Sequence, residues 1–266
     1  MITLALLQTR PRFLDVEANW KSVSAIIERS EADVFVLPEL FLSGYTFSGV
    51  EEVASAALTP DSRVFDAMRK LSAERRIAIC GGYAEADAGE PGKLYNSAFL
   101  IADGELTANY RKTHLFYRES KFFAPGDSGF VTVEYHGARL GIMICFDWIF
   151  PEAARTLALM GAQIILHPSN LVLPYCQTAM YARAIENRVF IVTVNRVGRE
   201  TNTHGDDLTF TGRSQVVSPS GEYLLSFNDT EEASRTVAVD PSLADNKQLN
   251  QFNTILADRR PEMYRL

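Results

Sequence analysis

The sequence predicts an α/β fold in which two β-sheets pack against each other and helices cover their outer faces. Short, almost entirely apolar runs such as Ile2–Leu7 and Val34–Leu37 are typical of buried strands. Longer segments between such runs repeat apolar residues at helical spacing. Asp103-Gly104 separates two further apolar runs, which is typical of an antiparallel hairpin. Together these observations favour mixed sheets with helices outside.

The N-terminal half alternates strands and helices. A helix is expected over Val16–Ser30, with Asp15 as its N-cap because a carboxylate accepts hydrogen bonds from the free N–H groups of a first turn. A second helix is expected from about Ser62 to Arg75, capped by Asp61. Strands are expected at Ile2–Leu7, Val34–Leu37, Ile77–Tyr83, Ser97–Ala102 and Glu105–Tyr110.

The C-terminal half continues in the same way. Gly141–Cys145 is expected to be a strand, followed by a helix that begins at Pro151-Glu152 and ends at Gly161. Proline suits the first helical turn and glycine suits the position past the last one. The remaining elements are expected to be a helix at Tyr175–Arg188 and strands at Gln163–His167, Phe190–Asn195, Ser214–Ser218, Tyr223–Phe227 and Arg235–Val239.

Composition limits the possible functions. The 266 residues contain no linker-like stretch, so a single domain over 1–266 is expected, with a polar tail from about residue 241. The net charge is −7 and the basic residues are scattered, which argues against a nucleic-acid partner. No apolar run approaches the roughly 18 residues of a membrane span, and no cleavable leader is recognisable. Three cysteines, an odd number, favour a reducing compartment, and we expect a cytoplasmic protein.

Three apolar runs end on reactive side chains. Glu39 follows Val34–Leu37, Lys112 follows the strand that ends near Tyr110, and Cys145 ends Gly141–Cys145. Residues at strand ends are held at the rim of a sheet, where a scaffold can direct them into a cleft. A carboxylate, an ammonium and a thiol can serve as acid/base, oxyanion stabiliser and nucleophile. The pattern indicates a covalent hydrolase.

Each of these residues also has an ordinary structural interpretation. A cysteine in an apolar run is more often a small core residue, although a thiol at a strand-to-helix turn can be accessible and favoured as thiolate. Glu39 and Lys112 can be exposed at strand ends, and Glu119 can lie on a helix surface. Cys80 and Cys176 have no acid or base nearby in sequence, so we expect both in the core.

No cofactor is expected from the sequence. The four histidines lack the spacing of metal ligands and suggest no Cys/His dyad. Gly81-Gly82 lacks the later glycine and lysine of a phosphate-binding loop. We therefore expect neither a metal nor an organic cofactor, and a small molecule as the partner.

Three motifs surround the reactive residues. They are Leu37–Leu40, Tyr110–Leu115 and Ile144–Glu152 in this order, supported by Phe123–Asp127, His167–Asn170 and Arg183–Asn187. These motifs resemble the nitrilase superfamily of carbon–nitrogen hydrolases, in particular its short microbial and archaeal nitrilases and amidases, and the resemblance covers essentially the whole chain. It implies a four-layer αββα sandwich, commonly a homodimer or higher oligomer, and no metal.

The resemblance also implies roles. Glu39 matches the general base, Lys112 the lysine beside the developing negative charge, and Cys145 the nucleophile. Glu119 matches a further glutamate that orients Lys112 and substrate. The backbone N–H of Phe146 is expected to share the oxyanion with Lys112. This Glu-Lys-Cys triad implies a thioester intermediate.

The residues after the cysteine favour a class of substrate. Cys145-Phe146-Asp147 resembles the amidase and carbamoyl-amide branches more than the Cys-Trp-Glu of typical nitrilases. We therefore expect hydrolysis of a small amide or carbamoyl amide to acid and ammonia. A nitrilase acting on a small aliphatic nitrile is the alternative, and an acyltransferase or a thiol redox sensor is the second. Beside the motifs, pocket residues are expected at Tyr45, Phe146, Trp148, Phe150 and Asn170, for whose aromatic members a core role stays open.

The C-terminal segment bears on assembly. Phe252–Leu256 and Met263-Tyr264 are apolar within an otherwise polar tail. They are expected to dock either on a neighbouring subunit or on the chain's own core.

Overall fold

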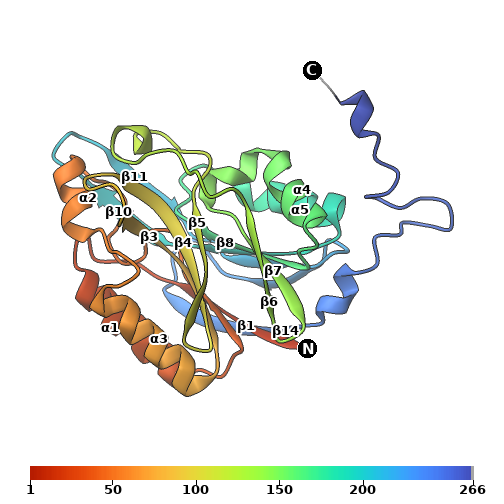
Figure 1. The fold of residues 1–266 in the computed structure, drawn as a ribbon, viewed down its shortest axis with the longest axis horizontal. Coiled ribbons are helices and arrows are strands. Elements are labelled where there is room, and N and C mark those ends of the chain that lie inside the picture. The colour runs from red at the N-terminus through yellow and green to blue at the C-terminus, as the bar shows by residue number, and fades with distance from the viewer. Residues whose placement is uncertain (265–266) are drawn as a thin grey trace.

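The computed structural model describes residues 1–264 as two six-stranded mixed sheets with helices outside them (Figure 1). The first sheet has the order β14-β1-β2-β3-β4-β5, and the pairs β1–β2 and β2–β3 are parallel. Its other pairs are antiparallel. The strands are β1 (Ile2–Gln8), β2 (Val34–Val36), β3 (Ala78–Ala86), β4 (Leu94–Ala102), β5 (Glu105–Arg111) and β14 (Ala233–Val239).

The second sheet repeats this arrangement. Its order is β13-β12-β9-β8-β7-β6, with parallel pairs β7–β8 and β8–β9 and antiparallel pairs elsewhere. The strands are β6 (Val131–Tyr135), β7 (Ala138–Ile142), β8 (Ile164–Ser169), β9 (Phe190–Asn195), β12 (Gln215–Val217) and β13 (Tyr223–Ser226). A separate hairpin consists of β10 (Val197–Thr201) and β11 (Asp207–Thr211).

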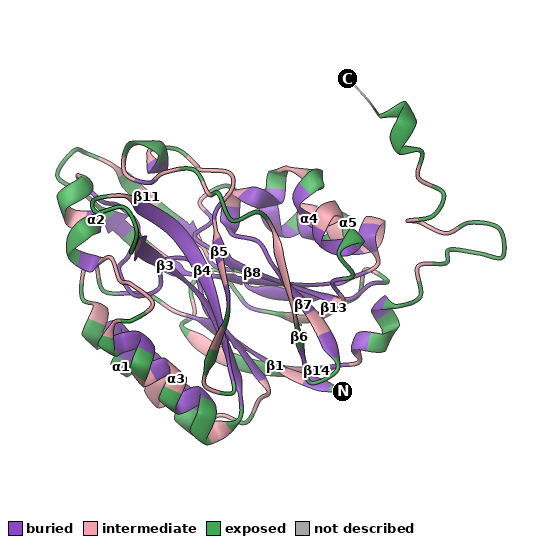
Figure 2. Ribbon diagram, in the orientation of Figure 1, coloured by how far each residue is buried: buried purple, intermediate pink, exposed green. Residues whose placement is uncertain are grey.

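Helices form the two outer layers, which confirms the predicted αββα sandwich. α1 (Val16–Arg29) and α3 (Arg63–Arg75) pack on the first sheet, whereas α4 (Pro151–Leu159) and α5 (Cys176–Asn187) pack on the second. Figure 2 shows these helices buried only along the side that faces a sheet. No helix within residues 1–264 has the length and apolar character to cross a membrane. Short helices are α2 (Val50–Ala56), η1 (Glu119–Lys121), η2 (Cys145–Ile149), η3 (Pro241–Ala244) and η4 (Pro261–Met263).

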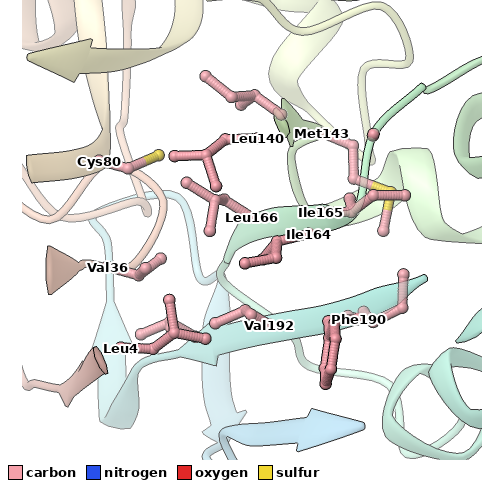
Figure 3. Packing of buried hydrophobic residues seen from close by; sticks show 14 of the residues in the cluster. Leu4, Val36, Cys80, Leu140, Met143, Ile164, Ile165, Leu166, Phe190 and Val192 are labelled. Atoms are coloured by element: carbon pink, nitrogen blue, oxygen red, sulfur yellow. The ribbon is translucent and has the colours of Figure 1, made fainter. Parts of the chain in front are cut away.

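Alternation along the strands forms two cores. In β1, Leu4 and Leu6 face the core between the sheets, while Ala5 and Leu7 face the core under α1 and α3. Successive side chains of a strand point to opposite faces, so a strand buried on both faces is apolar throughout. Figure 3 shows the core between the sheets, where Leu4, Val36 and Cys80 lie opposite residues of β7, β8 and β9. Cys80 is thus a core residue, as predicted.

The structure confirms one of the two predicted helix caps and contradicts the other. The Asp15 side chain accepts a hydrogen bond from the backbone N–H of Ala18, 3.1 Å away, as expected for the N-cap of α1. The prediction for Asp61 was wrong, because Ser62 is the N-cap of α3 and makes no side-chain capping bond. α2, β6, β10 and β11 were not predicted.

The C-terminal segment projects from the body of the protein (Figure 1). Phe252, Met263 and Tyr264 are all exposed, so these side chains do not dock on the chain's own core.

Candidate active site

The two sheets bring the predicted reactive residues together at strand ends. β3–β4 and β4–β5 are both antiparallel, so β5 runs in the same direction as β2. Glu39 follows β2 and Lys112 follows β5, so both leave the same edge of the first sheet. Cys145 follows β7 of the second sheet. The exposed fractions of Glu39, Lys112, Glu119 and Cys145 are 0%, 1%, 4% and 3%, which rules out the solvated interpretations of the charged residues.

Lys112 lies between two carboxylates. Its Nζ donates to Glu39 Oε1 at 2.6 Å and to Glu119 Oε1 and Oε2 at 2.8 and 2.9 Å. Burial disfavours the ammonium, but the charges of Glu119 and Glu39 outweigh it and raise the pKa of Lys112 well above its ordinary value. Burial raises the pKa of Glu119, and Lys112 opposes that shift. Lys112 therefore stays charged while buried.

Asn96 orients both carboxylates, a role that sequence reasoning missed. Its Nδ2 donates to Glu39 Oε1 at 2.7 Å and to Glu119 Oε2 at 3.4 Å. Glu39 Oε2 has no hydrogen-bond partner among the described residues, although it is buried. One oxygen of Glu39 is thus fixed by Asn96 and Lys112 while the other is free to accept a proton.

Tyr45 lies behind Glu119. Its hydroxyl donates to Glu119 Oε1 at 2.7 Å, and burial raises its pKa well above its ordinary value, which keeps the phenol neutral as a donor. We predicted Tyr45 as a pocket residue; it lies against this carboxylate and lines a small cavity together with Glu119, apart from the pocket beside Cys145.

We predicted that Cys145 is the last residue of a strand. It is instead the first residue of a tight turn. β7 ends at Ile142, and Cys145 begins η2 with a φ of +40°. Non-glycine residues rarely adopt such a conformation, and it persists only where neighbouring contacts impose it. Two such contacts come from His167 and Asp147.

His167 supports the backbone of Cys145. Its Nε2 lies 2.9 Å from the Cys145 carbonyl oxygen, and its Nδ1 lies 3.1 Å from Thr193 Oγ1. Burial lowers the pKa of His167 to about 4, so the ring is neutral at pH 7 and its Nε2–H can donate to the carbonyl. We predicted no role for this histidine, which lies inside β8.

Asp147 closes the turn on its other side. Its carboxylate accepts from the Ile144 N–H at 2.8 Å and from the Tyr110 hydroxyl at 2.8 Å. It also contacts His114 Nδ1 at 2.7 Å. From the sequence we used Asp147 only to infer the class of substrate. In the structure it joins the turn at Cys145 to the end of β5.

Burial of His167 predicts a pH-dependent stability. Its folded-state pKa of about 4 lies below the ordinary value of 6.5, so the unfolded chain binds more protons between these values. Stability from this residue is complete above pH 6.5 and is lost as pH falls toward 4. Between pH 7 and pH 4, urea unfolding should show about 3 kcal/mol more loss for the unmodified protein than for His167→Gln. Equal losses would mean that His167 is not buried as a neutral ring.

The thiol of Cys145 is neutral at rest. Burial raises its pKa well above the ordinary value, the charge of Glu39 raises it further, and Lys112 and the backbone N–H of Asn170 oppose the shift. Burial and the nearby carboxylates outweigh the lysine, which favours the thiol form over the thiolate that a strand-to-helix turn can stabilise. The charges of Glu39 and Lys112 both act on Cys145, which indicates that the three residues lie near one another. A neutral thiol needs a base to accept its proton when it reacts.

A small pocket opens beside Cys145. Its volume is only about 10 Å³, so it is narrow. The predicted Phe146, Trp148 and Asn170 line it, and both side-chain polar atoms of Asn170 are buried without a partner among residues 1–264. Phe150 instead stacks on His114 at 3.8 Å. Lining residues that were not predicted are Phe116, Leu171, Val172 and Leu173.

Within residues 1–264, no group of three or more His, Cys, Asp or Glu side chains could hold a metal ion. The polar groups around Cys145 are the lysine, the two glutamates, an amide and backbone N–H groups. This arrangement can transfer protons and stabilise an oxyanion around a sulfur nucleophile.

Comparisons with known proteins agree with this geometry. The carbon–nitrogen hydrolase family model matches residues 3–248. A nitrilase from Pyrococcus abyssi is 41% identical over 268 residues, covering 99% of both chains. An (R)-stereoselective amidase from Pseudomonas is 38% identical over 199 residues, covering 73% of this chain and 69% of its own.

Solved structures point the same way. A nitrilase-superfamily amidase from Nesterenkonia has a TM-score of 0.80 at 26% identity, covering 98% of this chain and 95% of its own. Another structure of that amidase carries acrylamide added to its active-site cysteine. The family match over most of the chain and the full-length relative show that this chain belongs to the carbon–nitrogen hydrolases of the nitrilase superfamily, as an enzyme of the amidase and nitrilase type.

Proposed function

We propose that this enzyme hydrolyses a small amide or carbamoyl amide to acid and ammonia through a thioester on Cys145. The observation that carries the proposal is the buried Lys112, held between Glu39 and Glu119, whose charges act on the Cys145 thiol. Burying charged groups costs free energy, and such clusters are typical of functional sites.

In the first half of the reaction, the free Oε2 of Glu39 accepts the proton of the Cys145 thiol. The sulfur forms a bond to the amide carbon, and the carbonyl π electrons move to oxygen. The Lys112 ammonium and the Phe146 backbone N–H stabilise this oxyanion, and each such donor is worth about 10²–10³ in rate. Glu39 then protonates the leaving nitrogen, the C–N bond breaks and ammonia departs.

In the second half, Glu39 takes a proton from water, and the hydroxide oxygen attacks the thioester carbon. The C–S bond breaks, Cys145 regains its proton, and the acid leaves. Asn96 and Glu119 act as positioning residues, because they hold Glu39 and Lys112 by the hydrogen bonds described above.

The pocket supports a small, uncharged acyl group. Its lining beside Cys145 is aromatic and aliphatic, with the Asn170 amide as the polar group free to bind substrate. An amide carbonyl supplies the oxygen that Lys112 and the Phe146 N–H can stabilise. A nitrile instead passes through a thioimidate whose nitrogen must be protonated in the same place.

A paired panel tests the amide preference. Amides and nitriles that share one short acyl group are compared by the kcat/KM of ammonia release. The amide of each pair should react faster. A consistent preference for nitriles above about tenfold, or about 1.4 kcal/mol in the transition state, would favour the nitrilase alternative, which the likeness to the Pyrococcus abyssi nitrilase supports. Such a preference would leave the roles of the three residues unchanged.

The remaining alternatives have less support. A thiol redox sensor needs a reactive thiolate, whereas the pKa of Cys145 is raised. An acyltransferase would require an added amine, so ammonia and free acid formed in equal amounts without one would exclude it. The three free cysteines fit a reducing compartment, and we propose the cytoplasm.

We also propose that the protein is a homodimer or a larger homo-oligomer. Ile149, Leu159, Met160 and Tyr181 are exposed on or next to α4 and α5, and the projecting tail exposes Phe252. Light scattering of the purified full chain should give at least the dimer mass, and removal of residues 249–266 should weaken the association. A stable monomer at working concentration would contradict the proposal without affecting the chemistry.

A further inference from the structure

An arginine-rich cavity lies apart from the active site. Its volume is about 560 Å³, and it is formed by the segment 9–13 after β1, one face of α1 and the start of β10. None of the residues that line it also lines the pocket beside Cys145. Four arginines and two glutamates line it, which gives a positive charge in a chain whose net charge is −7.

Arg196 brings an unused donor to this cavity. It is 1% exposed, its Nη1 donates to Glu200 Oε1 at 2.9 Å, and its guanidinium lies 4.0 Å from the centre of the Phe210 ring. Its Nε has no partner within residues 1–264, and neither has the buried Oγ1 of Thr9. An unsatisfied buried donor is costly, and a charged one more so, so a ligand that accepts from both groups would be stabilised.

Two further guanidinium groups have no counterion. Arg10 and Arg12 line the cavity and are exposed, and their side chains form no ion pair within the described part of the chain, while Glu232 of the same cavity accepts from the Arg10 backbone N–H at 3.3 Å. The side chain of Arg10 lies on Gly198, where a Cβ would come within 2.8 Å of its Cδ and Nε. Burial lowers the pKa of Arg196, Glu200 opposes that shift, and the charge of Arg10 lowers the pKa further.

We propose that this cavity binds a small molecule that carries a phosphate group. Guanidinium groups match phosphate oxygens in a bidentate geometry, and phosphate offers more acceptor oxygens than a carboxylate to Arg10, Arg12, Arg196 and Thr9. The cavity volume leaves room for an organic part, which the neighbouring Phe13 can contact.

A chain of hydrogen bonds joins the cavity to the active site. Glu200, the partner of Arg196, accepts through Oε2 from the backbone N–H groups of Tyr45 and Thr46, both at 2.8 Å. Tyr45 in turn donates to Glu119, which holds Lys112. A phosphate bound by Arg196 is therefore two residues away from the carboxylate that orients the lysine.

Isothermal titration tests the proposal in phosphate-free buffer at constant ionic strength. The probes are inorganic phosphate, glycerol 3-phosphate and, as a dicarboxylate, malonate. We expect saturable binding of a phosphate compound, weakened at least about tenfold by Arg10→Ala and by Arg12→Ala, because each removes charge-assisted hydrogen bonds. Arg63→Ala, which removes an exposed arginine of α3, is the matched control and should bind normally. Thr9→Val should weaken binding less than either arginine variant.

Comparing the two phosphate probes shows whether the ligand is an organic phosphate or the free phosphate ion. Tighter binding of glycerol 3-phosphate than of phosphate indicates an organic phosphate ligand, and the reverse indicates the free ion. Arg10 and Arg12 are exposed, so their variants should keep the circular dichroism of the unmodified protein. No binding by either phosphate compound, equal binding by both arginine variants and the unmodified protein, or tighter binding of malonate would overturn the proposal.

Discussion

Cys145→Ala should lower ammonia release from a substrate amide by at least about 10⁴-fold, the scale seen when a nucleophile is removed from a catalytic triad. Cys145 is the sulfur nucleophile of the proposed reaction, and alanine cannot form the thioester. The hydrogen bonds among Glu39, Lys112 and Glu119 do not involve the sulfur, so the rest of the site should be preserved. Turnover at saturating amide, measured as ammonia, checks the result.

Cys176→Ala is the matched control. Cys176 is also buried and its pKa is also raised by burial, but it lies on α5 and contributes no group to the active site. This variant should retain turnover. Mass spectrometry should find an acyl adduct on Cys145 of the unmodified protein and none on Cys145→Ala. Ammonia release by Cys145→Ala above about one hundredth of the normal rate would refute the covalent mechanism.

Lys112→Ala should reduce kcat by at least about 10²–10³-fold, because it removes the cation at the developing oxyanion. It should also destabilise the fold by about 3–5 kcal/mol, since Glu39 and Glu119 would be left buried without their shared counterion. Steady-state kinetics and urea unfolding measure the two effects separately. Lys112→Arg should not rescue kcat, because a planar guanidinium does not fit between two carboxylates that hold a compact ammonium.

Glu39→Gln provides a test that separates chemistry from folding. The glutamine oxygen can still accept from Lys112, yet its amide nitrogen cannot take a proton from Cys145. We expect kcat to fall about as far as in Lys112→Ala with a smaller loss of stability. Lys70→Ala, on the exposed face of α3, should change neither quantity. Full activity of Lys112→Arg would mean that the lysine serves only as a structural counterion.

The strands and helices could be predicted wherever periodicity was strong. The apolar runs that became β1, β8 and β9 and the amphipathic pattern of α1 were sufficient. The end of β7 was missed because Met143 and Ile144 are as apolar as the strand before them, although the chain has already left the ladder. The hairpin of β10 and β11 was missed because polar residues dominate it. Its buried Glu200 is explained by Arg196 and by the distant backbone N–H groups of Tyr45 and Thr46.

Part of the active site could be predicted because some of its residues follow strongly apolar strands. Glu39 and Lys112 follow apolar strands, so their position at a sheet edge could be inferred. Asn96 and His167 could not be assigned, because each lies inside a strand that looks like an ordinary core strand. Their function depends on hydrogen bonds to residues 57 and 22 positions away, and such pairings exist only after the sheets have formed.

The pairing of β1 with β14 governs how the protein can be assembled. Ile2 lies opposite Val239 and Gln8 opposite Ala233, so the strand made early in synthesis acquires its outer neighbour only when more than two hundred further residues have been made. Until then β1 offers an unpaired edge, the kind of surface that recruits strands from other molecules. Closing so long a loop is slow, since its entropy is lost before any contact is gained. The nascent chain therefore keeps this edge of β1 unpaired until β14 has been made, and a chaperone that shields β1 should reduce aggregation during synthesis.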